Sequence, residues 1–415
     1  MKIAIIGSGI SGLSSALFLD KDNTIKIFEQ NNRLGGHANT VDLNINGSKC
    51  PVETGFIVHN DTNYPNFNKF LDYLNINSIN SSMSFSVSVD NGEFEYGSSY
   101  KGLLNAKNLL NPKYLKMLSE VRHFYQNAKK DILNGPDDET LGEFLLRMKY
   151  SETFIDFHIL PMTASIWSSS KKVIKEFSAK TFLNFFSNHK LLNFFDRPQW
   201  KTVSGGSIKY IEAVEKKIKG KIERNSKIIS IKKQKDGIYI ISKSKKEKFD
   251  EIIFACNTNS ILKIIDDDFL EEKNILKDFK FEKNVSILHS DYTFMPKNKS
   301  FWSSWNYFGK SKSEGSLYMT YWMNNLQKLP TSENIFLSLN PPTLPKIEKI
   351  FGQYKYEHPI LNNHTNKAQI KLSEIQGKNN LWFCGAWTKN GFHEDGILSA
   401  LKISEKLGSN PPWII

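Results

Sequence analysis

The chain has 415 residues, a formal net charge of +12 and a sequence pI near 9.2. This length can hold two domains with a substantial core, and because no apolar run reaches about 18 residues, no membrane-spanning helix is predicted. The three cysteines, Cys50, Cys256 and Cys384, are too few and too scattered for a disulfide framework or a metal site, which favours a reducing compartment.

The N-terminal segment carries the pattern of a dinucleotide-binding βαβ unit. An apolar strand, Ile3–Ile6, leads into Gly7-x-Gly9-x-x-Gly12, and a helical segment and a second apolar strand follow before Glu29. In such units the first glycine permits a tight turn, the second lets backbone N–H groups approach a pyrophosphate, and the third lets helix and strand pack closely. Glu29 stands where an acid accepts hydrogen bonds from ribose hydroxyls. The context predicts a Rossmann-type α/β domain that binds a dinucleotide.

Arg33-x-Gly35-Gly36 extends this site beyond the acid. The glycine pair lets the backbone close over the pyrophosphate while the cation offsets its charge. The extended pattern resembles glutathione-reductase-like flavoproteins and, among them, the flavin amine oxidase and phytoene desaturase superfamily. The resemblance implies non-covalent FAD, held by an α/β Rossmann-type domain that carries a discontinuous α+β substrate domain.

The next segment, residues 69–199, loses the βαβ rhythm and becomes helix-rich and aromatic. Within it, Lys101–Lys130 mixes leucines with lysines, and Pro112 is expected to divide it into two helices. Basic amphipathic helices lie on lipid surfaces, although they also form ordinary domain surfaces. We expect a cytoplasmic protein that associates peripherally with the inner face of the membrane through this segment and Leu191–Trp200. No recognised nucleic-acid-binding motif accompanies the positive charge, so nucleic acid is not an expected partner.

Nucleotide-type strands return in the second half of the chain. Trp200–Ser207 resembles the superfamily segment that leads back to the FAD domain, and a helix is predicted over Ile208–Ile218. Lys227–Ile231 and Gly237–Ser242 read as a hairpin, and Phe249–Cys256 as one further strand. The pattern predicts an FAD-binding domain from residues 1–68, 200–262 and 376–411, and a substrate domain from residues 69–199 and 263–375.

The C-terminal block, with a predicted strand at Leu381–Ala386 and a helix from Gly396 to Leu407, resembles the flavin-binding end of the superfamily. A helix N-terminus directed at the flavin stabilises negative charge on its reduced form, and Gly396 and Ile397 are the expected contacts. Many relatives carry an acid directly after the strand glycine, where this chain has Ala386. Glu394, Asp395 or a backbone group is therefore expected to bind a ribityl hydroxyl.

Three signatures narrow the resemblance: Gly35–Asp42, Val52–Phe67 and Gly391–Gly396. They are similar to a bacterial branch of NAD/FAD-binding proteins that includes the flavin desaturase of furan fatty acid formation. The resemblance implies dehydrogenation of a fatty acyl chain, methyl-branched, unsaturated and carried on a phospholipid, by hydride transfer to flavin N5. The electron acceptor is oxygen or an unidentified acceptor. The residues implied to bind FAD are Gly7, Gly9, Ser11, Gly12, Glu29, Gln30, Arg33, Gly35, Gly36, Gly55, Phe56, Ile57, Ile228, Ile229, Gly385, Ala386, Gly396 and Ile397.

The candidate bases that would remove the second proton are His59, His393 and Glu394, since a histidine or a carboxyl of raised pKa suits this task near neutral pH. Three alternatives stay open: an amine oxidase, a flavin-dependent isomerase of an unsaturated lipid, and a lipid-binding protein without functional FAD. His189 and His358 are expected at the surface. The aromatic residues that could line an acyl tunnel, or simply pack in the core, are Trp167, Phe182, Phe185, Phe186, Phe194, Phe195, Trp302, Trp305, Tyr307, Tyr321 and Trp322.

Overall fold

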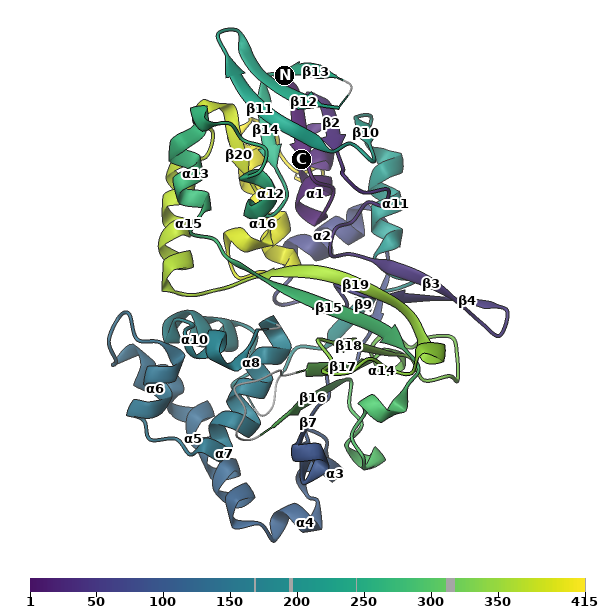
Figure 1. The fold of residues 1–415 in the computed structure, drawn as a ribbon, viewed down its shortest axis with the longest axis vertical. Helices are drawn as coiled ribbons and strands as arrows, with labels where there is room; N and C mark the ends of the chain where they lie inside the picture. The colour runs from purple at the N-terminus through teal and green to yellow at the C-terminus, as the bar shows by residue number, and fades with distance from the viewer. Residues whose placement is uncertain (168, 194–196, 244, 311–317, 415) are drawn as a thin grey trace.

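The computed structural model describes residues 1–167, 169–193, 197–243, 245–310 and 318–414, without the side chains of Tyr100 and Lys101. A parallel sheet with its helices forms one end of the molecule, and a larger sheet with a group of helices forms the other (Figure 1). Phe194 and Phe195, two of the predicted tunnel residues, lie outside the described residues.

The parallel sheet has five strands, and β1 lies at its centre. The strand order is β10 (Lys221–Glu223), β2 (Thr24–Phe28), β1 (Lys2–Ile6), β14 (Glu251–Phe254) and β20 (Leu381–Phe383). Ile3, Ala4 and Ile5 are fully buried, as expected for a parallel sheet covered on both faces. All five strands fall within the three blocks predicted for the FAD-binding domain, while the exact domain limits remain a prediction.

Helices from distant parts of the chain cover this sheet (Figure 1). They are α1 (Ile10–Leu19), α2 (Pro65–Tyr73), α11 (Ile208–Lys217), α12 (Thr258–Ile261), α13 (Leu270–Leu276), α15 (Asn363–Ile375) and α16 (His393–Lys406). A three-stranded antiparallel sheet lies beside them, formed by β11 (Ile228–Gln234), β12 (Gly237–Ser242) and β13 (Lys246–Phe249). The predicted hairpin is thus confirmed as β11 and β12.

The second large sheet joins two segments that are far apart in the sequence. Its order is β19 (Ile350–Pro359), β15 (Phe281–His289), β18 (Phe336–Leu339), β17 (Tyr318–Trp322), β16 (Trp305–Gly309), β7 (Phe85–Val89) and β8 (Phe94–Gly97). Only the β16–β7 pair in it is parallel among the described strands. Two small sheets connect the large ones: β3 (Thr40–Ile45) with β4 (Ser48–Glu53), and β5 (His59–Asn60) with β9 (Trp200–Val203) and β6 (Ser78–Asn80).

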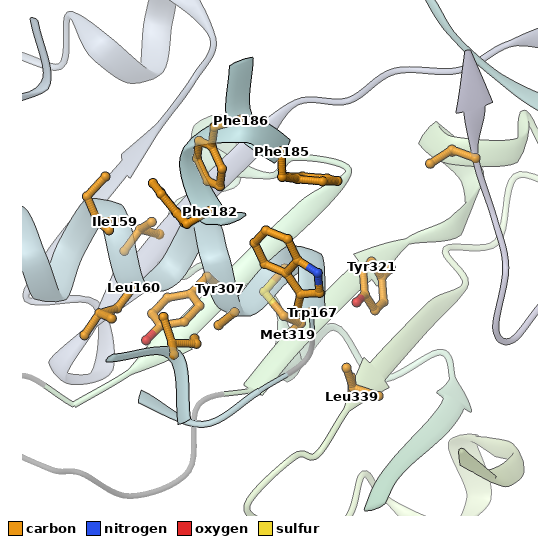
Figure 2. Close-up of a cluster of buried hydrophobic side chains, with 14 of the residues drawn as sticks. Ile159, Leu160, Trp167, Phe182, Phe185, Phe186, Tyr307, Met319, Tyr321 and Leu339 are labelled. Carbon is orange, nitrogen blue, oxygen red and sulfur yellow. The ribbon is translucent and has the colours of Figure 1, made fainter. Parts of the chain in front are cut away.

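A helical layer packs against the β7–β16 side of this sheet. It comprises α3 (Tyr100–Leu103), α4 (Ala106–Leu109), α5 (Pro112–Leu133), α6 (Leu141–Arg147), α7 (Glu152–Phe154), α8 (Leu160–Trp167), α9 (Lys171–Lys175) and α10 (Ala179–Asn188); α14 (Met323–Gln327) follows β17. Figure 2 shows Phe185 and Phe186 beside Trp167, with Tyr321 and Leu339 of the sheet on the other side. Aromatic packing between helices and sheet therefore forms much of this core.

Three element boundaries differ from the sequence predictions. The strand expected over Phe249–Cys256 is broken at Asp250, whose carboxylate accepts a hydrogen bond from the Lys2 backbone N–H at 2.7 Å. Helix α16 begins at His393, ahead of the predicted start, because the Asp395 carboxylate caps the Phe392 N–H at 3.0 Å. Pro112 is the first residue of α5, but the residues before it form two short helices rather than one. No described helix is both long and apolar enough to cross a membrane.

Candidate functional site

A cavity of about 1420 Å³ lies between the carboxyl ends of the parallel strands and the seven-stranded sheet. Residues directly after β1, β2, β14 and β20 line one part of it, and β7, β16, β17 and β18 contribute to the other. Drug-sized ligands occupy cavities of about 300–1000 Å³. The space is therefore large enough for a dinucleotide together with a second molecule.

The glycine motif has the geometry that its spacing predicts. Gly7 has φ +105°, and a Cβ there would lie 2.6 Å from the Ala255 carbonyl oxygen. A Cβ on Gly12 would lie 2.0 Å from the Gly7 oxygen, so glycine is required for helix α1 to pack on β1. A Cβ on Gly9 would meet no atom within 4 Å, because Gly9 borders the cavity. Close packing fixes two of the glycines, and open space surrounds the third.

The N-terminus of α1 faces this open space without a side-chain cap, because its N-cap residue is Gly9. The first N–H groups of a helix lack intrahelical partners and carry partial positive charge, which makes such an end an anion site. Ser11, in the first turn, also lines the cavity. The helix therefore offers donors where the sequence predicts a pyrophosphate.

Glu29 and Arg33 form the rim of the same site, and both line the cavity together with Gln30. The Glu29 carboxylate accepts hydrogen bonds from the Ser8 hydroxyl at 2.6 Å and the Asn31 backbone N–H at 2.9 Å. These bonds hold the acid beside the glycine loop. The Arg33 guanidinium donates to the Gly36 carbonyl oxygen at 2.8 Å, which holds Arg33 against the Gly35-Gly36 turn.

The glycine pair itself turns back onto the first motif. Gly35 and Gly36 have φ +105° and +60°, and Gly35 forms a parallel bridge with Gly9. Gly36 lines the cavity, whereas Gly35 is buried behind it. A Cβ on Gly36 would lie 3.1 Å from the Gly9 Cα, so the two loops touch through glycines.

The remaining predicted cofactor residues divide into two groups. Those that line the cavity are Gly55, Phe56, Ile57, Ile228, Gly385 and Ala386. Ile229, next to Ile228 on β11, is 53% exposed, because successive side chains of a strand point to opposite sides. A side-chain role for Ile229 in the cavity is therefore excluded.

Gly396 and Ile397 pack against other parts of the protein. A Cβ on Gly396 would lie 2.8 Å from the Ile10 Cγ2 and 2.9 Å from the Ser11 Oγ, so this glycine lets α16 pack closely on α1. Its N–H already donates to the Phe392 carbonyl oxygen at 3.1 Å. Ile397 is fully buried in the core. Neither residue is among those that line the cavity, and their contact with flavin stays a prediction.

His393 is the candidate base that lines the cavity. Its ring stacks on Phe56 with centroids 3.6 Å apart, and its Nε2 lies 2.9 Å from the Tyr210 hydroxyl. Burial, and the charges that His37 and His59 would carry, lower the pKa of His393 well below its usual value. The imidazole is therefore neutral near pH 7 and has a lone pair that can take up a proton, while burial makes it a weaker base than free histidine.

The other two candidate bases are placed differently. The Glu394 carboxylate accepts hydrogen bonds from the backbone N–H groups of Asn66 at 3.0 Å and Phe67 at 2.9 Å, so it caps the start of α2. His59 is 1% exposed, bonds to the Ser78 hydroxyl at 2.9 Å and lies behind the cavity wall. Neither residue lines the cavity and both are engaged in structural hydrogen bonds, so the geometry favours His393 among the three candidates.

Many relatives carry an acid where this chain has Ala386. Neither Glu394 nor Asp395, the two carboxylates expected to take its place, lines the cavity. Asp395 accepts hydrogen bonds from the N–H groups of Asn390 at 3.2 Å and Phe392, and Glu394 is held at α2. Both carboxylates thus act as helix caps. The geometry therefore favours a backbone group for the ribityl contact, which stays a prediction.

Two histidines expected at the surface instead line the cavity, namely His189 and His358. Burial lowers the pKa of His189 to about 4, and burial together with His37 lowers the pKa of His358 to about 3. Their polar sequence neighbours gave no sign of this, because tertiary contacts between distant segments bury them. Tyr64 and Trp200 line the cavity as well and were likewise missed.

The part of the cavity formed by the seven-stranded sheet and the helices is mostly apolar. Its apolar lining residues are Met83, Phe85, Met162, Ile166, Trp167, Phe185, Leu191, Trp305, Tyr321, Leu337 and Leu339. Its polar lining residues are Asn80, Ser81, Ser82, Ser165, Gln199, Asn324 and Asn325. A long apolar wall with a small polar region suits a ligand with an alkyl body and a polar group.

Two cations belong to this part, Arg197 and Lys328. Among the described residues that line the whole cavity, the acids are Glu29 and Glu357. Both belong to the dinucleotide side, since Glu29 follows β2 and Glu357 bonds to Asn257 after β14 at 2.7 Å. We call the part of the cavity formed by the seven-stranded sheet and the helices the substrate-side wall. As far as it is described, this wall carries positive and no negative charge.

Comparison with known proteins supports the fold assignment. Residues 5–74 match the family of NAD(P)-binding Rossmann-like domains. The CLA-producing fatty acid isomerase of P. acnes superimposes with a TM-score of 0.69 at 15% identity, covering 100% of this chain and 98% of that chain. Cyclohexylamine oxidase of Brevibacterium oxydans IH-35A gives a TM-score of 0.71 at 14% identity, with 98% and 99% coverage. Wild-type putrescine oxidase bound to putrescine gives 0.64 at 13% identity, also with 98% and 99% coverage. No curated protein matches the sequence.

Proposed function

Because this chain has a Rossmann-type dinucleotide domain and the two-domain fold of the flavin amine oxidase superfamily, we propose that it is an FAD-dependent oxidoreductase that dehydrogenates a fatty acyl chain. The acyl chain is unsaturated and methyl-branched, and it is carried on a phospholipid. The uncapped end of α1, the open space at Gly9 and the acid Glu29 fit the pyrophosphate and ribose of FAD.

The observation that carries this proposal is the charge of the substrate-side wall. Arg197 and Lys328 are cations there, and no carboxylate of the described chain lies beside them in this wall. An acyl lipid presents a carboxylate, ester or phosphate, all of which accept hydrogen bonds and two of which are anionic. An ammonium substrate offers only donors and a positive charge, so it gains no hydrogen bond from these two exposed cations and is weakly disfavoured beside them.

Trp305 adds a donor to the same wall. It lines the cavity, and its buried indole nitrogen has no hydrogen-bond partner among the described atoms. A buried N–H without a partner costs about 1–3 kcal/mol, and an ester or carboxyl oxygen would remove that cost. The surrounding apolar residues can hold an alkyl chain, since each buried methylene contributes about 0.8 kcal/mol.

The residues of this chain supply positioning and proton transfer. When bound, FAD supplies the capacity to accept a hydride from an activated C–H bond. His393, neutral and placed on the cavity wall between Phe56 and Tyr210, would take the proton that leaves the neighbouring carbon. Loss of one hydride and one proton converts the acyl chain to a diene, and the apolar wall excludes water.

Anaerobic mixing of the flavin-loaded protein with lipids tests the proposal. Phospholipids with methyl-branched unsaturated chains are expected to bleach the flavin absorbance, whereas monoamines and polyamines are not. Arg197→Gln combined with Lys328→Gln should raise KM for the lipid by about tenfold, as expected for loss of a charged contact worth about 1.4 kcal/mol, with little change in kcat. Bleaching by amines and not by lipid would make the protein an amine oxidase.

His393→Gln is expected to lower the rate of flavin reduction by about 10² to 10⁴-fold, the usual contribution of a general base. His59→Gln and Glu394→Gln are the matched controls, and their reduction rates should stay within about threefold of the parent. Because the pKa of His393 is lowered, its base form persists as the pH falls, so kcat should be flat from about pH 8 down to about pH 6. Stopped-flow absorbance measures these rates, and retained flavin colour shows that the cofactor remains bound.

One observation favours an amine as the second candidate. Trp305 and Tyr321 form an aromatic pair in the cavity with centroids 4.9 Å apart, and aromatic rings bind cations. The rings meet edge to face at 83°, so only one of them can present its face to the same ligand. An isomerase acting on an unsaturated lipid is the third candidate, and the bleaching experiment distinguishes it because isomerisation leaves the flavin oxidised.

A further inference from the structure

An apolar and basic surface lies at the end of the molecule opposite the parallel sheet, around α4 and the start of α5 (Figure 1). We define it as the basic leucine surface, formed by Leu104, Leu110, Leu115, Lys107, Lys113 and Lys116. Leu104 is 48% exposed, Leu110 85% and Leu115 47%. Single exposed leucines are common on proteins, but a cluster of them indicates an interaction site.

The inner side of the same segment is anchored to the protein. Asn108 is buried and donates a hydrogen bond to the Glu95 carbonyl oxygen at 2.7 Å. Tyr114 is fully buried and donates to the Leu103 carbonyl oxygen at 3.0 Å. The exposed leucines therefore belong to a segment that is fixed to the protein by its buried side chains.

The charge of this surface has one sign. No Asp or Glu occurs between Glu95 and Glu120 in the sequence. Lys107, Lys113 and Lys116 are exposed, and no ion pair joins them to a carboxylate in the described part of the chain. An acid-free segment that carries both exposed lysines and exposed leucines suits a partner that is both anionic and apolar.

A second exposed apolar pair provides a comparison. Leu344 is 69% exposed and Ile347 is 86% exposed, so each is more exposed than Leu104 or Leu115. Glu348 lies beside this pair, between two lysines in the sequence. The apolar exposure is similar, but the unopposed positive charge belongs to the basic leucine surface.

We propose that the basic leucine surface docks the protein on an anionic phospholipid bilayer. The leucines would enter the boundary between headgroups and acyl chains, and the lysines would contact the lipid phosphates. An interfacial position agrees with the absence of a spanning helix among the described residues. This docking does not depend on the proposed reaction, and its test needs no substrate.

Flotation of the flavin-loaded full chain with vesicles tests the docking. Phosphatidylcholine vesicles containing about one third phosphatidylglycerol should carry the protein upward at about 50 mM salt and release most of it at about 500 mM. Pure phosphatidylcholine vesicles should carry about tenfold less. The triple variants Lys107→Gln/Lys113→Gln/Lys116→Gln and Leu104→Ser/Leu110→Ser/Leu115→Ser should each bind about tenfold more weakly.

The double variant Leu344→Ser/Ile347→Ser is the matched control, and it should float like the parent. The proposal is overturned if the parent does not float with anionic vesicles at low salt. It is equally overturned if the control loses binding while the two triple variants keep it. Thermal unfolding and flavin content of each variant show that the fold is intact, so weaker flotation reports the surface alone.

Discussion

Gly9→Val is expected to yield folded protein that is colourless. The added side chain would project into open space, since a Cβ on Gly9 meets no atom within 4 Å, and the φ of −68° at this residue suits valine. The protein itself is therefore not strained, but the pyrophosphate path is blocked at the end of α1. FAD affinity should fall by at least about 100-fold, or about 2.7 kcal/mol, measured by flavin absorbance after dialysis and by titration of the apoprotein.

Gly12→Val is the matched experiment, and we expect this variant to be destabilised. Its Cβ would lie 2.0 Å from the Gly7 carbonyl oxygen, so α1 must move away from β1. Overpacking of this kind costs about 3 kcal/mol or more, and the apoprotein should unfold at a lower temperature. Thermal unfolding of both apoproteins compares the two. A Gly9→Val protein that is yellow, or that is as unstable as Gly12→Val, would contradict the assignment of Gly9 to the cofactor path.

The folded protein should lose stability steeply below about pH 6. Burial lowers the pKa of His59 to about 4, of His158 to about 3 and of His289 to about 4. The unfolded chain takes up these protons near the ordinary pKa of about 6.5, while the folded chain does not. The stability is therefore complete above about pH 6.5 and is lost as the pH falls toward the folded pKa values.

Each of these histidines contributes about 1.4 kcal/mol per pH unit in that window, so the three together contribute about 4 kcal/mol per unit, and the cavity histidines His189, His358 and His393 add to the slope in the same direction. Asp395 opposes them, because burial raises its pKa to about 6 and the folded state binds its proton first. Urea unfolding at several pH values measures the slope. His289→Gln, which keeps an acceptor for the Asp291 N–H and a donor for Ser338, should reduce the slope by about 1.4 kcal/mol per unit.

The dinucleotide part of the fold could be predicted from local sequence because its determinants are close together. Gly7, Gly9, Gly12 and Glu29 occupy one βαβ unit, and each position follows from a backbone requirement that the sequence displays. The broken strand at Asp250 could not be predicted, since the residue that bonds to its carboxylate, Lys2, lies 248 residues away in the sequence. Apolar periodicity alone does not reveal which sheet a strand joins.

The choice among the three candidate bases could not be made from the sequence either. His59, His393 and Glu394 were equivalent in the sequence, because each lies within a signature motif. Only the folded structure shows that Glu394 caps α2 and that His393 stacks on Phe56 at the cavity wall. Arg197 and Lys328 were missed for a related reason, since an isolated cation in a lysine-rich chain gives no signal of its own.

The packing of α16 on α1 sets the order in which the protein can become functional during synthesis. β1 and α1 leave the ribosome before α16, which packs on α1, and before β20, which forms the edge of the parallel sheet beside β14. Long-range pairing of this kind is slow, and the early segment exposes apolar surface until its partners arrive. A chain that stops before Leu381 would lack one edge of the parallel sheet and the helix that covers α1. Flavin colour in a nascent-chain or truncation series should therefore appear only once α16 is present, which makes it a direct reporter of complete folding.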